Sequence, residues 1–250
     1  MSSELGLLPA RRFVKRKTSV DNRKMTSPLR SFVQFAPLER KLRQVAQKSP
    51  DWKGQNKALA GPPLIEYELT KARHWDTVTP QASRLRACLE VVSAPPQPAG
   101  ELNQTLLLHL HSLLLDRAAD GSEFRQGTGT RVTEGHVYLD PTAIPRALVR
   151  FFEWTASEAF AEMHALEQVT LCQVRLYEIW PFEAYSGLAA DFFTLRVLYL
   201  RTSLLPLFSV EEVSDFQEAL SEAFGFVTKP LVDFYLRACE RACDQILGQL

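Results

Sequence analysis

The residues best suited to chemistry lie in one stretch, Ile179 to Asp191, where a proline separates two apolar segments. Trp180-Pro181 is expected to end the first helix, because a proline disfavours helical geometry in the preceding residue and has no N–H to donate. Ser186 is expected to cap the next helix by accepting from its first free amides. Such a helix start can hold an anion, since several N–H groups point outward at the positive end of the macrodipole. The same features occur at ordinary helix corners, which the residues alone favour.

Four residues of this stretch match a known signature in register, namely Ile179, Pro181, Phe182 and Gly187. From about Leu106 to Leu250 the chain resembles the Fic (Fido) family, whose signature reads H-P-F-x-[DE]-G-N-G-R-x-x-R after an isoleucine at a helix end. Most active members of that family transfer AMP from ATP to a hydroxyl group of a protein. The resemblance implies that this stretch corresponds to the active-site loop.

Nearly every chemical position of the signature is changed. The histidine that would take the proton from the target hydroxyl is Trp180, the acidic magnesium ligand is Ala184, and the Gly-Asn-Gly phosphate cradle is Tyr185-Ser186-Gly187. The two arginines are Leu188 and Asp191. An indole has no basic nitrogen, and losing a positioned base alone costs about two to four orders of magnitude in rate. A methyl group holds no metal, and a side chain at the first glycine resists close approach of phosphate.

The carboxylate of Asp191 would repel a phosphate, whereas the arginine of the signature at this position would attract it. Near a protein surface, two charges about 4 Å apart interact by about 4 kcal/mol at an effective dielectric of about 20. We therefore predict no catalytic residue, no metal site and no cofactor, and we do not expect ATP or magnesium to bind. The residues at the signature positions are then vestigial: Trp180, Ala184, Ser186, Gly187, Leu188 and Asp191.

Glu66 is the candidate remnant of an inhibitory helix. In many Fic proteins an N-terminal helix carries [ST]-x-x-x-E-[GN], whose glutamate pairs with the second signature arginine and blocks productive ATP binding. Here Pro62 and Tyr67 replace the flanking residues of that motif, and Asp191 replaces the arginine. A glutamate facing Asp191 would be repelled, so we expect Glu66 to face solvent.

Two short strands around a glycine-bearing turn are predicted over Phe124–Val132 and Gly135–Pro141. They resemble the flap of Fic proteins, which adds a strand to the target segment through main-chain hydrogen bonds. The resemblance makes Thr130, Arg131 and Val132 the candidate peptide-docking residues, although a charge such as Arg131 also serves to protect an exposed edge. His136 on this flap is the one histidine that could replace the lost base, and we expect it to be solvated.

Apolar periodicity predicts helices along the rest of the chain. The expected ranges are 38–47, 80–92, 106–114, 143–156, 157–180, 189–200, 211–224 and 229–250, with a polar connector at 51–60. The fold class is therefore mainly α, a Fic-like helical bundle with a short β-hairpin flap. We expect a basic, disordered arm at 1–35, an N-terminal helical extension at 36–100 that ends in the proline-rich run 93–100, and a Fic-like domain at 101–250.

Composition excludes several classes of function. The 29 basic and 29 acidic residues balance, so the whole chain has no field that would gather nucleic acid or an anionic membrane. No apolar run approaches the roughly 18 residues needed to cross a bilayer. The four cysteines, without a C-x-x-C pair, indicate reduced thiols in the cytoplasm. Cys239 and Cys243 could share a metal on one helix face, but packing is favoured because no histidine lies nearby.

Three hypotheses for function follow from these patterns. The first is a catalytically inactive Fic-like protein that binds a protein partner through its flap and vacated cleft. The second is an active nucleotidyl or phosphoryl transferase with non-standard catalytic residues, which would need a base such as His136 or Glu183. The third is a nucleic-acid-associated protein that acts, or is directed to the nucleus, through the basic arm.

Overall fold

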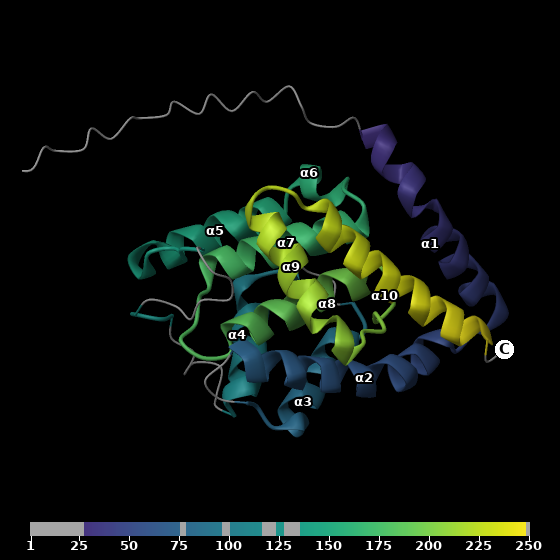
Figure 1. The fold of residues 1–250 in the computed structure, drawn as a ribbon, viewed down its shortest axis with the longest axis horizontal. Helices are drawn as coiled ribbons and strands as arrows, with labels where there is room; N and C mark the ends of the chain where they lie inside the picture. Colours follow the sequence, from purple (N-terminus) through teal and green to yellow (C-terminus); the bar gives the residue numbers. More distant parts are fainter. Residues whose placement is uncertain (1–27, 76–78, 97–100, 117–123, 128–135, 249–250) are drawn as a thin grey trace, which may run out of the picture.

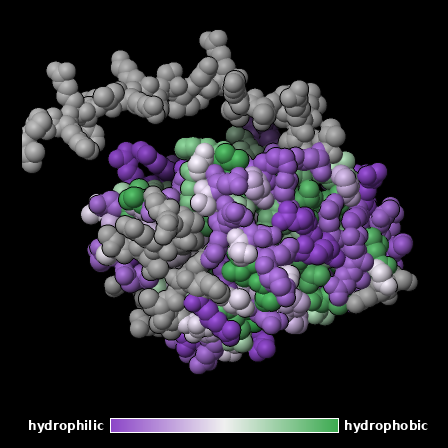
Figure 2. Space-filling view, in the orientation of Figure 1, coloured by the Kyte–Doolittle hydropathy of each residue, from purple (hydrophilic) through white to green (hydrophobic). Residues whose placement is uncertain are grey.

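The computed structural model describes residues 28–75, 79–96, 101–116, 124–127 and 136–248. Within these ranges every regular element is a helix and none is a strand (Figure 1). The same residues contain no helix that is long and apolar enough to cross a membrane. Hydrophilic residues cover most of the face shown in Figure 2, with hydrophobic residues in small groups between them.

Helix α8, Ser186–Thr202, is the centre around which the other helices pack (Figure 1). Its residues are buried without interruption from Ser186 to Leu198, which is expected of a helix that is surrounded on all sides. Helices α7 (Ala165–Ile179), α4 (Gln104–Leu115) and α3 (Ala82–Ser93) make its main contacts. The sequence-based prediction of a central buried helix over 189–200 is confirmed, with a start three residues earlier.

The N-terminal helices share this core. Helix α1, Pro28–Lys48, lies along α10, and helix α2, Trp52–Trp75, contacts α3, α8 and α10. The expected arm ended at residue 35, but α1 already begins at Pro28.

The expected polar connector at 51–60 is wrong, because it forms the start of α2. Asn56 explains this difference: its amide donates to the Leu205 carbonyl at 3.0 Å and its oxygen accepts from the Leu205 N–H at 2.6 Å. Pro62 and Pro63 lie inside the same helix. Burial of Leu64 and its neighbours in the common core therefore outweighs the lost backbone hydrogen bonds.

The segment 157–180, expected as one helix, is divided into α6 (Glu158–Ala161) and α7. His164 starts α7 through a capping box: its Nδ1 accepts from the Leu166 N–H, while the Glu167 carboxylate accepts from the His164 N–H, both at 3.2 Å. Before α6 come the short helix η3 (Pro141–Ala143) and α5 (Ile144–Thr155). A local cap thus interrupts a continuous apolar pattern.

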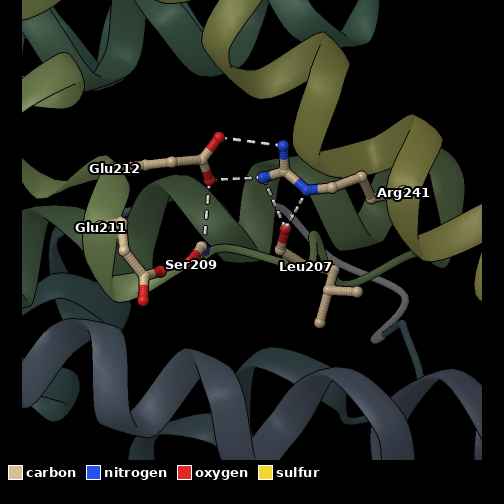
Figure 3. A network of polar contacts seen from close by, with 5 residues as sticks. All are labelled: Leu207, Ser209, Glu211, Glu212 and Arg241. Carbon is tan, nitrogen blue, oxygen red and sulfur yellow. Dashed lines mark hydrogen bonds and ion pairs between the residues drawn. The ribbon is translucent and has the colours of Figure 1, made fainter.

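The C-terminal helices close the bundle. The short helix η4 (Val210–Glu212) leads into α9 (Val213–Phe224), and α10 (Lys229–Gly248) packs between α9 and α1. Arg241 of α10 donates to both oxygens of Glu212 and, at 2.9 Å, to the Leu207 carbonyl (Figure 3). This bidentate pair fixes the turn before α9 against α10.

Only part of the predicted flap lies among the described residues. Thr130, Arg131 and Val132 lie outside the described residues. The described flanks, 124–127 and 136–140, form no strand. Their backbones pair with the α7–α8 corner instead: the Arg125 N–H donates to the Pro181 carbonyl at 2.9 Å and the Leu139 N–H to the Glu178 carbonyl at 3.2 Å. The expected strand pairing is therefore absent from these flanks.

Candidate functional site at the α7–α8 corner

Trp180 ends α7 as expected, but its side chain turns inward. It is the C-cap residue, with a left-handed backbone (φ 46°), and its N–H still donates to the Leu176 carbonyl at 2.8 Å. The indole is 1% exposed and packs against the rings of Tyr138 and Tyr177, with centroids 5.0 and 5.4 Å away. Its Nε1 has no hydrogen-bond partner among the described residues. The indole is therefore a buried side chain that packs through its rings.

The indole of Trp180 lies against the first turn of α8. A Cβ atom placed on Gly187 would lie 3.2 Å from Cη2 of Trp180 and 3.2 Å from the hydroxyl oxygen of Tyr177. Ser186 and Leu188 on either side are also buried. A side chain at this position would therefore have to push Trp180 or Tyr177 aside by a few tenths of an ångström, so the glycine favours the close approach of the two rings.

Ser186 does not cap α8 as predicted. The N-cap residue is Tyr185, with φ 56° and no side-chain cap, and Ser186 is already the first helical residue. Because of this shift, the hydroxyl of Ser186 points back into the loop and accepts from the Phe182 N–H at 3.1 Å. The serine thus bonds within the loop, and the N-cap residue Tyr185 makes no side-chain cap bond to α8.

Arg125 and His111 bond carbonyls of the α7–α8 loop and of the flap flanks. The Arg125 guanidinium, in a residue 2% exposed, donates to the carbonyls of Trp180 and Gly127, both at 2.6 Å, and to that of Leu139. A cation at this position also suits the negative end of α7. His111 stacks on Phe182 at 3.7 Å and donates from Nε2 to the Ala184 carbonyl at 3.0 Å. Neither residue was singled out from the sequence as part of the site.

Asp191 differs most from expectation. It is 3% exposed and does not project into an open pocket as a repelling charge. Its Oδ2 lies 2.6 Å from Nζ of Lys71 on α2, and its Oδ1 accepts from Tyr177 Oη at 2.8 Å and from Gln173 Nε2 at 2.6 Å. Buried charges persist when they are paired and hydrogen-bonded in this way. Asp191 is therefore a structural anion that joins α8 to α2 and α7.

Glu68 completes this buried cluster. One of its oxygens lies 2.8 Å from Nζ of Lys71, so one ammonium group faces two carboxylates. Burial and, next, the nearby charge of Asp191 raise the pKa of Glu68 to about 8, although Lys71 opposes the rise. Burial likewise raises the pKa of Tyr177, which keeps its hydroxyl protonated as a donor. The raised pKa favours a protonated Glu68 at neutral pH, so that Lys71 is left to pair with Asp191.

Glu66 is exposed, as expected, and the α2 residue that reaches Asp191 is Lys71. Compared with the glutamate–arginine pair that the resemblance implies, the charges are exchanged: the N-terminal helix supplies the cation and the signature position supplies the anion. The spacing of Glu68 and Lys71 on one helix face was visible in the sequence. Their partner in a distant helix was not.

No alternative base or metal site forms at the corner. His136 is half-buried and stacks on Phe224, with ring centroids 3.8 Å apart. Burial lowers the pKa of this histidine. The ring of Tyr138 contacts both His136 and Trp180. Glu183 is exposed. The described residues contain no group of three or more histidine, cysteine, aspartate or glutamate side chains that could hold a metal ion. The four cysteines are buried, and burial raises the pKa of each thiol.

Solved structures of Fic proteins resemble this chain in fold. A fragment of Fic-1 from C. elegans matches with a TM-score of 0.62 and 15% identity, covering 90% of this chain and 75% of that chain. A Fic-domain-containing signalling protein from Bacteroides thetaiotaomicron matches with a TM-score of 0.59 and 17% identity, covering 89% of this chain and 97% of that chain. A Fic family protein from Desulfovibrio desulfuricans matches with a TM-score of 0.57 and 15% identity, covering 86% of this chain and 74% of that chain. No protein-family model and no curated protein matches the sequence.

Proposed function

From the premise that the chain has the Fic (Fido) fold, we propose that it is a Fic-like protein that no longer transfers AMP and acts by binding a protein partner. The observation that carries this proposal is the indole of Trp180 packed over Gly187, at the helix start that would hold a phosphate. The residue at the position of the base thus lies against the first turn of α8.

The other contacts at the corner support the same conclusion. The carbonyl of Ala184 is bonded to His111, and its methyl side chain offers no metal ligand. Asp191 is committed to Lys71. Binding of a triphosphate would require Trp180 to leave the core, at a cost of about 3–5 kcal/mol for a large aromatic side chain. In this proposal the side chain of Trp180 fills the cleft, which leaves the flap as the expected contact region.

The flanks of the flap favour this role. Arg125 and Leu139 attach both flanks to the α7–α8 corner through main-chain hydrogen bonds. A peptide that pairs with Thr130, Arg131 and Val132 would use main-chain groups and would need little side-chain chemistry. Partner binding in this mode survives the loss of every catalytic side chain.

Nucleotide binding is the first test. Thermal unfolding of the full chain should be unchanged by millimolar ATP with magnesium, relative to magnesium alone. A ligand about a hundredfold above its dissociation constant would add about 2.7 kcal/mol, which is readily measured. Trp180→His should not produce self-modification with labelled ATP, because the metal and phosphate positions remain altered. Stabilisation by ATP, or modification by the wild-type chain, would overturn the proposal.

The flap requires its own test. Proximity labelling with the full chain would identify partners, and their affinity would then be measured with two variants. Val132→Pro removes a main-chain donor and should abolish pairing, while Val132→Ala keeps the donor and should bind as the wild type does. Equal affinity of both variants would show that the partner does not add a strand to this segment.

A further inference from the structure

A groove of about 590 Å³ runs between α2 and α3 and shares no lining residue with the α7–α8 corner. On α2 its lining includes Gly54, Ala58, Gly61, Ile65 and Leu69, which recur every three or four residues. Residues at this spacing form one stripe along a helix. At 1.5 Å per residue the stripe is roughly 22 Å long, or about four turns.

The floor of the groove is apolar and shallow. Ile65 and Leu89 are 8% and 5% exposed, and a Cβ atom on Gly61 would lie 3.1 Å from Cδ2 of Leu89, so α2 and α3 touch there. Ala58 and Pro62, by contrast, are exposed along the groove. Small side chains above a closed apolar floor leave space for another element to approach.

The two ends of the groove differ in charge. At one end Lys57 of α2 and Glu90 of α3 form an ion pair at 2.5 Å that bridges the helices. At the other end Glu66 of α2 and Arg86 of α3 are both exposed, and within the described part of the chain no ion pair involves either of them. That end offers one acidic and one basic group to a partner.

We propose that this groove docks an amphipathic α-helix of a partner protein. The helix would place an apolar face of about four turns on the floor, a basic residue beside Glu66 and an acidic residue beside Arg86. A helix fits better than a strand, because both walls are helices whose backbone donors are used internally, whereas helix-in-groove recognition needs only side-chain contacts. The inference concerns a surface other than the flap and stands whether or not the α7–α8 corner binds a nucleotide.

Selection from a displayed library of 16-residue peptides, with the full chain as bait, tests the proposal. Ala58→Trp fills the groove at an exposed position and is the counter-selection bait. Ala46→Trp, at an exposed alanine of α1, is the matched control. Circular dichroism and the Tm of both variants establish that each is folded.

Enriched peptides should carry apolar residues at helical spacing and bind with about micromolar affinity, since one short helix covers less than a standard interface of about 800 Å² per partner. Ala58→Trp should weaken binding at least about tenfold, and Ala46→Trp should not. Arg86→Glu should weaken peptides that have an acidic residue at the matching position, and a lysine there should restore binding. These results would support the assignment.

Three results would overturn it. One is enrichment of no peptide, or only of peptides without helical spacing. Another is equal binding to the wild type and Ala58→Trp. The third is a dimer of the wild-type chain in sedimentation experiments that Ala58→Trp dissociates, which would assign the groove to a second copy of this chain.

Discussion

Replacing Glu68 by glutamine is expected to raise the free energy of unfolding at pH 8 and to leave it nearly unchanged at pH 5. The carboxyl of Glu68 has a pKa of about 8 in the folded chain, against 4.5 for the ordinary group, because it is buried beside Asp191. Between these two values the unfolded chain loses the proton while the folded chain keeps it. Stability therefore falls as pH rises from about 4.5 to about 8. Glutamine keeps the size and the donor capacity of the protonated acid but does not titrate.

The magnitude follows from the same values. Each pH unit within this window costs at most about 1.4 kcal/mol, so an isolated group would lose about 4 kcal/mol between pH 5 and 8. Because the charge of Asp191 and the ammonium of Lys71 act on Glu68 in opposite directions, we expect a difference on the order of 2–3 kcal/mol.

Urea unfolding of the wild type and Glu68→Gln at several pH values between 5 and 9 measures this difference. Because other titrating groups are common to both proteins, only the gap between the two curves matters. Glu66→Gln, an exposed substitution on the same helix, is the control, and its free energy of unfolding should change with pH as that of the wild type does. Parallel curves for Glu68→Gln as well would refute the inference that Glu68 is buried in its protonated form.

Further substitutions test the corner itself. Arg125→Met should cost about 3 kcal/mol in urea unfolding, because several buried carbonyls lose their donor, whereas Arg175→Met at the exposed surface should cost less than about 1 kcal/mol. Gly187→Ala should destabilise by about 1–3 kcal/mol, and the loss should shrink in a Trp180→Phe background if the indole is the obstacle. Lys71→Met should cost about 3–5 kcal/mol in urea unfolding, because a buried carboxylate loses its cation; a loss below about 1 kcal/mol would contradict this.

Most of the helices and their order could be predicted from the sequence, with α2 as the main exception. The expected ranges for α3, α5, α9 and α10 agree with the structure within a few residues, and the corner after Ile179 was located correctly. Apolar spacing, prolines and the glycine at 187 act through near neighbours, so their effect is local and can be recognised without knowledge of the fold. The substituted signature positions were also evident from the residues alone.

The environment of those positions depended on the packing of distant helices. Nothing near Asp191 in the sequence shows that Lys71 would meet it, that Ser186 would bond Phe182 in place of the helix amides, or that Trp180 would fill the space above Gly187. A buried charge or ring is stable only where other elements supply its partners. The sequence therefore determined which chemical groups stand at the corner, and the tertiary structure decided that they are paired, covered and turned into the core.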